Sequence, residues 1–180
     1  MKRYILISLL FGLISCQNNS REKSSDQIDT LANQDFDKNP IGKETGCKWI
    51  KDNVENYFNK GGGSIEKIQS LTIPEYYEFK MDAINTGLDL DSSITEFELA
   101  QKWKSKFDIK TAGLGNGFLI SGQDWKNIQV SSCELLNENA SEINLKVLIS
   151  DCDFQTDYHR DIKLVLLGNQ IKIADVKEYD

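Results

Sequence analysis

The chain has a single histidine, His159, among its 180 residues. A Ser-His-Asp or Cys-His catalytic arrangement would therefore need this one residue to meet a nucleophile. A zinc site is also poorly supported, because there is no second histidine and no pair of cysteines has the Cys-x-x-Cys spacing. We interpret His159 as a solvated or hydrogen-bonded strand residue, with a role as a base as the alternative, and we expect no metal ion and no other cofactor.

Basic residues are in the minority. The sequence has 21 Lys and Arg against 28 Asp and Glu, which gives a formal net charge of -7. Binding to nucleic acid depends on Lys and Arg side chains that neutralise phosphates, and an anionic membrane surface repels an acidic protein. No basic cluster offsets the acidic balance, so the composition argues against nucleic acid as a partner.

Long apolar runs are also scarce, and the one that stands out lies at the start of the chain. Residues 4–14 are apolar apart from Ser8 and Gly12, and they follow the basic residues Lys2 and Arg3. The run is too short to cross a bilayer as a helix, which takes roughly 20 apolar residues. A positive start followed by a short apolar core is the layout of a secretory signal.

This segment ends in Leu-Ile-Ser-Cys at residues 13–16, which resembles the lipobox of bacterial lipoproteins. The resemblance implies cleavage before Cys16, a diacylglycerol on its thiol and acylation of the new amino terminus, so that covalent lipid makes the membrane a partner. Gln17 resembles the non-Asp position that permits sorting to the outer membrane of Gram-negative bacteria. A plain secretory signal with an incidental Cys16 is the alternative.

Composition divides the chain into a signal peptide at residues 1–15, a lipid-anchored flexible tether at 16–46 and one globular domain at 47–180. The tether is polar, with too few apolar residues to close a core. Beyond it, aromatic and aliphatic residues become regular over a length that is usual for a single core.

The domain has two halves with different hydrophobic periods. The first half predicts three amphipathic helices. The first helix has Ile50, Val54, Tyr57 and Phe58 on one face and should end at the three glycines 61–63. The second has a stripe of Tyr77, Met81, Ile84 and Leu88, and the third carries Phe97, Ala100, Trp103, Lys104 and Phe107 on one side. Capping-box spacings at Thr72–Glu75 and Ser93–Glu96 predict where two of these helices begin. The second half alternates and predicts strands near 128–136, 143–149, 162–166 and 171–176. We therefore expect an α+β domain, with N-terminal helices packed on a curved antiparallel meander of about four strands.

In the order of the expected elements, helices come first, then Gly-Phe-Leu-Ile-Ser-Gly-Gln-Asp-Trp at 117–125, and then a meander that closes on Ile-Lys-Ile-Ala-Asp-Val at 171–176. This order resembles that of lipoproteins of the nuclear transport factor 2-like superfamily. The resemblance implies a cone-shaped sheet whose mouth can hold a ligand or be filled by side chains. In enzymes of this fold, such as the isomerases and cyclases, an Asp in the pocket acts as general base. Asp124 is the nearest candidate, with a turn or capping aspartate as the alternative.

Two loop patterns imitate binding motifs. Gly-Leu-Gly-Asn-Gly at 113–117 lacks the spacing of a nucleotide loop and follows an expected helix, so we interpret it as a mobile connector. Residues 89–93 open like an EF-hand loop, but Ile94 and Ala100 stand where Gly and Glu would be needed. Solvated loops are the simpler interpretation of both.

Three cysteines remain once Cys16 is assigned to lipid: Cys47, Cys133 and Cys152. An exported protein can form a disulfide. A hairpin turning at 137–141 would put Cys133 opposite roughly Lys146, about 20 Å from Cys152, whereas a disulfide needs Cα atoms within about 7 Å. Any disulfide should therefore join Cys47 to either Cys133 or Cys152.

These features predict an envelope-anchored lipoprotein without catalytic activity, which binds an envelope protein or a small apolar ligand. The alternative is a small-pocket enzyme of the isomerase or cyclase type that uses Asp124. A calcium-dependent module is a third hypothesis.

Overall fold

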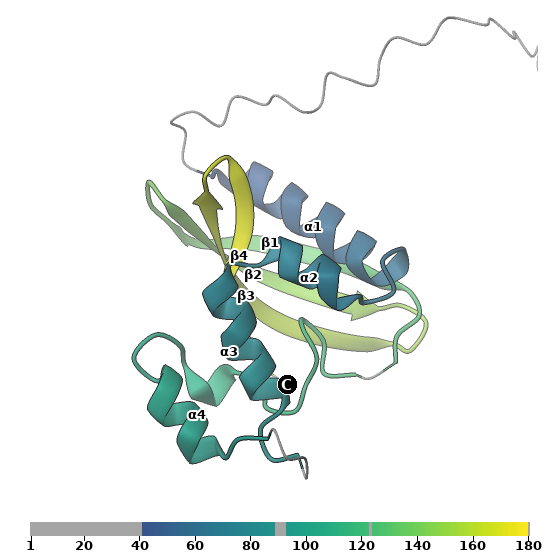
Figure 1. Ribbon diagram of the computed structural model, residues 1–180. Coiled ribbons are helices and arrows are strands. Elements are labelled where there is room, and N and C mark those ends of the chain that lie inside the picture. The colour runs from purple at the N-terminus through teal and green to yellow at the C-terminus, as the bar shows by residue number, and fades with distance from the viewer. Residues whose placement is uncertain (1–40, 89–92, 123, 180) are drawn as a thin grey trace, which may run out of the picture. The chain divides into compact units, whose positions relative to one another are not determined.

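The computed structural model describes residues 41–88, 93–122 and 124–179. In these residues, helices α1 (Lys43–Asn59), α2 (Ile65–Leu71), α3 (Pro74–Ile84) and α4 (Glu96–Trp103) and the short 3-10 helix η1 (Ile109–Thr111) precede strands β1 (Ile128–Glu138), β2 (Glu142–Asp151), β3 (Thr156–Leu167) and β4 (Gln170–Glu178). The strands form one antiparallel sheet in the order β1-β2-β3-β4. Figure 1 shows α1 running alongside the strands. The domain is of the α+β class, as the sequence predicted.

Helix α1 has the predicted inward face and the predicted end. Ile50, Val54, Tyr57 and Phe58 are buried, and the helix stops at Asn59, before the three glycines. Gly63 has a φ of 68°, a conformation that glycine adopts at little cost. A Cβ atom at Gly63 would lie 2.6 Å from the Trp125 ring, so the close approach of this ring also requires glycine.

The folded domain begins earlier than its composition predicted. Ile41 is buried and α1 starts at Lys43, so residues 41–46 belong to the domain and not to the tether predicted at 16–46. Packing is the reason, because Gly46 lies against the side chains of Ile143 and Leu145 on β2. Cys16, the signal segment and the rest of the predicted tether lie outside the described residues.

Alternation along the strands gives the sheet one buried face. Ile143, Leu145, Val147 and Ile149 of β2 are all buried, with polar or half-buried residues between them. Cys133 on β1 pairs with Val147, one residue from the predicted Lys146. The hairpin pairs Glu138 with Ile143, so its turn is centred later in the chain than predicted, and an extra residue in β1 between Leu135 and Asn137 offsets part of that shift.

Each edge of the sheet is covered over part of its length. Along β1, the Asn59 side chain accepts from the Ile128 N–H (3.1 Å) and donates to its carbonyl (2.7 Å), and Glu55 accepts from the Val130 N–H (3.0 Å). Along β4, the Ile73 N–H donates to the Ile173 carbonyl (2.9 Å). Covered edges have no free ladder groups to template pairing with another chain at these positions.

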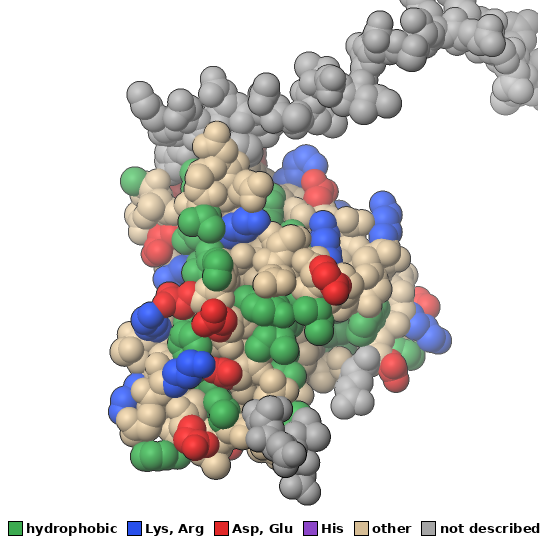
Figure 2. Space-filling model, viewed as in Figure 1, with side chains coloured by type: hydrophobic (Ala, Val, Ile, Leu, Met, Phe, Trp, Pro, Cys, Tyr) green, Lys and Arg blue, Asp and Glu red, His purple; other side chains and the backbone are tan. Residues whose placement is uncertain are grey.

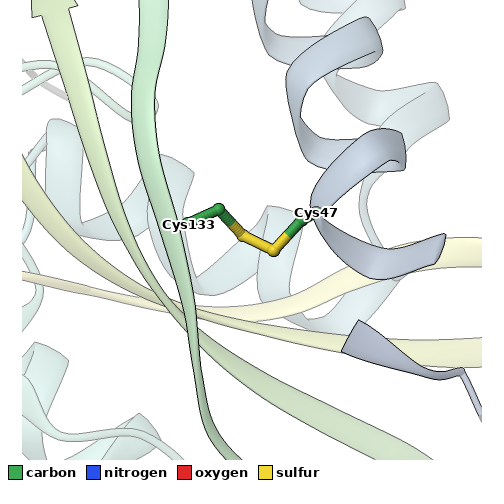
Figure 3. Close-up of a disulfide and its surroundings, with 2 residues drawn as sticks. All are labelled: Cys47 and Cys133. Atoms are coloured by element: carbon green, nitrogen blue, oxygen red, sulfur yellow. A yellow bond between two sulfur atoms is a disulfide. The ribbon is translucent and has the colours of Figure 1, made fainter. Parts of the chain in front are cut away.

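A disulfide links α1 to β1, at the edge of the sheet. Cys47 and Cys133 are bonded with their Cα atoms 5.8 Å apart, and Figure 3 shows the bond running from the helix to the strand. This is one of the two pairings that the sequence left open. Cys152 is a free, exposed thiol in the turn after β2.

The second and third predicted helices exist, but their details differ. Helix α3 buries Tyr76, Phe79, Lys80 and Ala83, whereas the prediction placed Tyr77, Met81, Ile84 and Leu88 inward. Its N-cap is Ile73, and the Thr72 hydroxyl instead donates to the Ile68 carbonyl (3.0 Å).

Helix α4 has its capping box at Thr95 and Glu98, two residues after the predicted pair Ser93 and Glu96. Leu99 and Trp103 are buried there, whereas Phe97 is 71% exposed. In both helices the apolar residues are spread widely enough that either of two faces could be buried. Packing against the rest of the domain decides which face it is. Four of the predicted aromatic residues nonetheless lie in the core: Tyr57, Phe58, Trp103 and Phe107. The Phe107 ring stacks on that of Phe79, with the ring centroids 4.3 Å apart.

Candidate functional site

A cluster of charged residues lies inside the domain, between α3 and the last two strands. Lys80 of α3 and Arg160 of β3 are fully buried, and Glu178 at the end of β4 is 7% exposed. The Lys80 ammonium pairs with Glu178 Oε1 and donates to the carbonyls of Ala112 (2.8 Å) and Gly113 (3.2 Å). Buried charges of this kind require partners, since an isolated ion loses its hydration on burial.

Arg160 holds the other side of this cluster. Its Nη2 lies 3.8 Å from Glu178 Oε2, its Nε donates to the Leu119 carbonyl (2.9 Å) and its Nη1 donates to the His159 carbonyl (2.7 Å). The guanidinium therefore fixes the segment around Leu119, which has a φ of 70°, against the sheet. The cluster joins α3, β3, β4 and the segment 112–121.

Gly113 and Tyr76 lie in the surroundings of the Glu178 carboxylate and are both affected by it. A Cβ atom at Gly113 would lie 1.9 Å from Glu178 Oε2, so only glycine fits there, and its φ of 60° also favours glycine. Burial and the negative charges of Glu178 and Asp175 raise the pKa of Tyr76 well above its ordinary value, although Arg160 opposes this. Residues 113–117, interpreted from sequence as a mobile connector, thus begin with a residue packed against a buried ion pair.

Sequence reasoning missed this cluster, although a signal was present. Lys80 lies four residues after Tyr76 on the inward face of α3, and Arg160 lies between Tyr158 and Ile162 in the inward alternation of β3. A charged residue at an inward position marks a buried ion pair. Because the charged side chains of this cluster are enclosed and hydrogen-bonded, we interpret the cluster as one that organises the fold.

Two adjoining hollows lie on the outer face of the sheet, opposite the core. The first, of about 390 Å³, is lined by Leu136, Lys146, His159, Arg160, Asp161 and Tyr179. The second, of about 400 Å³, shares Leu136 and Asp161 and adds Asn137, Asn144, Lys163, Asp175 and Lys177 from the strands, with Lys106 and Asp108 from the segment after α4. We call the two hollows together the outer basin. Their volumes fall within the range of small-molecule sites, roughly 300–1,000 Å³.

The candidate catalytic residues of the sequence analysis do not come together. His159 lines the first hollow on the exposed side of β3, and Asp161 is the acidic residue that lines it with His159. Asp124 is exposed in the irregular segment before β1 and lines neither hollow. The position of Asp124 is that of a surface residue, not that of a base inside a cone.

Comparison with family models, with curated proteins and with solved structures found no match.

Asp89 and Asp91 of the EF-hand-like pattern lie outside the described residues. Within the described ranges, no three His, Cys, Asp or Glu side chains group as a metal site, and no helix is long and apolar enough to cross a membrane. On the face seen in Figure 2, basic and acidic side chains are interspersed, unlike the basic stripe of a nucleic-acid-binding surface.

Asp151 is fully buried at the end of β2. Its carboxylate accepts hydrogen bonds from the backbone N–H groups of Lys126 (2.8 Å), Asn127 (3.4 Å), Asp153 (3.0 Å) and Phe154 (3.1 Å). Desolvation raises the pKa of this carboxyl, but the four backbone donors outweigh it and hold the pKa below the ordinary value of 3.8. Asp151 thus fixes the β2–β3 turn and the approach to β1.

We expect Asp151→Asn to lower the free energy of unfolding by about 2–3 kcal/mol at pH 7, because a charged acceptor of four part-buried backbone donors is lost. A lowered pKa means that the carboxylate stabilises the fold above its unfolded value of 3.8 and stops doing so as the pH falls through its folded value. Urea unfolding at several pH values should therefore show the difference between variant and wild type narrowing below pH 3.8. Asp153→Asn, at an exposed neighbour, is the control, and a difference that stays constant with pH would contradict the role of Asp151.

Proposed function

We propose that this protein is an exported lipoprotein, anchored through Cys16 to the outer membrane of a Gram-negative cell, whose domain binds a ligand or an envelope protein without catalysis. The observation that carries the proposal is the disulfide between Cys47 and Cys133. Disulfides persist in oxidising compartments and are rare in the cytosol. The basic start, the short apolar run and the Leu-Ile-Ser-Cys ending point the same way.

Binding is favoured over catalysis by the way the domain is filled. Tyr76, Phe79, Trp103 and Phe107 pack against one another on and just after α3 and α4. The inward residues of β2 are buried as well, whereas a cone-fold enzyme would need an open apolar cavity. The exposed position of Asp124 gives the isomerase or cyclase alternative no support. Helices before a four-stranded meander support the resemblance to nuclear transport factor 2-like lipoproteins at the level of layout. The outer basin supplies the binding surface.

Replacing Cys16 by Ser tests the anchor. In a Gram-negative host, we expect the wild-type chain in the outer-membrane fraction, because several acyl chains anchor a protein firmly whereas one chain binds only marginally. The Cys16→Ser variant lacks the thiol that carries the lipid, so almost all of it should be in the soluble fraction. Mass spectrometry of the wild type should find acyl groups on the peptide that begins at Cys16.

Cys152→Ser is the matched control, because this exposed thiol is free and its loss should leave the protein membrane-bound. A Cys16→Ser variant that stays in the membrane fraction would contradict the lipid anchor. Turnover of small substrates that disappears in Asp124→Asn would contradict the non-catalytic function.

A further inference from the structure

We propose that the outer basin binds a small zwitterion that carries an apolar group, such as an apolar amino acid. This inference rests on the proposed binding function and names the class of ligand. It is carried by the arrangement of charges that the strand register imposes on the outer face of the sheet, and by two apolar side chains at the basin's edge.

Charges of opposite sign alternate across the strands of the basin. Asp161 of β3 lies between Lys146 of β2 and Lys177 of β4 in one row, and Lys163 lies opposite Asp175 in the next. Directly opposed side chains in antiparallel strands have Cβ atoms about 4.5–5.5 Å apart. Any ligand with a single charge would therefore meet a like charge next to each opposite one, whereas a zwitterion can match both signs.

The groups best placed to take the two ends of a zwitterion can be named. Lys163 lies 3.5 Å from Glu142, and Lys106 pairs with Glu75, so both are already engaged. Lys146 lies opposite Glu134 and Asp161, and Lys177 lies opposite Asp161, in the strand register. Neither lysine forms an ion pair with another described residue, so both ammonium groups can turn to an anionic group of a ligand.

Asp175 is the acid best placed to receive the ammonium group. It is only partly exposed, and burial raises the pKa of this carboxyl, although Lys163 and Lys177 oppose the rise. A partly desolvated carboxylate gains most from a new cationic partner. The Asp161 carboxylate, by contrast, already accepts a hydrogen bond from the Tyr179 hydroxyl at 2.8 Å.

Leu136 and Tyr179 give the basin an apolar end. Leu136 is 46% exposed and Tyr179 is 50% exposed, and both line the first hollow. The hydrogen bond to Asp161 fixes the Tyr179 ring in place, so its face is available without reorganisation. An apolar ligand group that covers these two side chains would remove apolar surface from water.

Calorimetric titration of the full-length chain, purified from membranes in detergent, tests the proposal with three probes that share the benzyl side chain: zwitterionic L-phenylalanine, anionic N-acetyl-L-phenylalanine and cationic L-phenylalanine amide. We expect the zwitterion to bind about tenfold more tightly than the anion or the cation. Asp175→Asn and Lys146→Gln should each weaken its binding by about fivefold or more. Lys48→Gln, at an exposed site on α1, is the matched control and should change nothing.

Three results would overturn the proposal. The first is equal affinity for all three probes, and the second is binding that Asp175→Asn and Lys146→Gln leave unchanged. The third is no detectable heat from phenylalanine up to about 10 mM, a concentration at which ligands of this size that fit a site still bind measurably. The proposed function fails separately, through a Cys16→Ser variant that remains in the membrane, so the two failures are distinguishable.

Discussion

Glu178→Gln is expected to lower the free energy of unfolding by about 3–5 kcal/mol, the usual cost of removing one partner from a buried ion pair. The substitution keeps the size of the side chain but removes the negative charge that faces Lys80 and Arg160, both fully buried. Two cations would then remain in the interior without their carboxylate. Urea unfolding followed by tryptophan fluorescence and circular dichroism measures the change.

A double-mutant cycle with Lys80→Met separates the ion pair from general damage. If Lys80 and Glu178 act through their mutual attraction, the double variant should lose less stability than the sum of the two single variants, by at least about 1 kcal/mol. Glu142→Gln is the surface control, because its pair with Lys163 is about one-third exposed on both sides and should cost less than about 1 kcal/mol. Additive losses in the cycle would contradict the coupling.

Opening the disulfide is the second large effect. Cys47→Ser with Cys133→Ser should lower the free energy of unfolding by about 4 kcal/mol, because the bond closes a long loop and restricts the unfolded chain. The two cysteines are 86 residues apart. The same loss should follow treatment of the wild type with a reductant, measured as a shift in the urea midpoint.

Cys152→Ser is the control for this experiment. It removes the free thiol, prevents disulfide exchange and should change stability by less than about 0.5 kcal/mol, since the side chain is exposed. In this background, equal urea midpoints with and without reductant would contradict a stabilising role for the bond.

Local patterns predicted much of the secondary structure. The alternation of Ile143, Leu145, Val147 and Ile149 predicted β2 and its buried face, because side chains of a strand point alternately to opposite sides. The three glycines predicted the end of α1. Helices α3 and α4 were found, but the faces they bury were not, since Tyr76 and Tyr77 are adjacent aromatics and only packing decides which of them is enclosed.

The residues of the buried cluster and of the outer basin were harder to predict from the sequence. Lys80, Arg160 and Glu178 lie on three elements separated by up to 98 residues, and nothing local links them. The outer basin likewise depends on register: Asp161 lies between Lys146 and Lys177 only because β2, β3 and β4 pair as they do. Asp124 looked suited to a pocket because of its neighbours in sequence, but its position relative to the sheet is a tertiary property.

By itself, the sequence determined the α+β class, the four-stranded meander and the choice of Cys47 as one end of the disulfide. It did so because helix and strand periods are local and because spacing limits which thiols can meet. Only the tertiary structure decided that Cys133 is the other end, that a buried Lys80–Glu178–Arg160 cluster ties the helices to the sheet and that mixed charges line an open basin. Those features depend on which residues the folded chain brings together across its whole length.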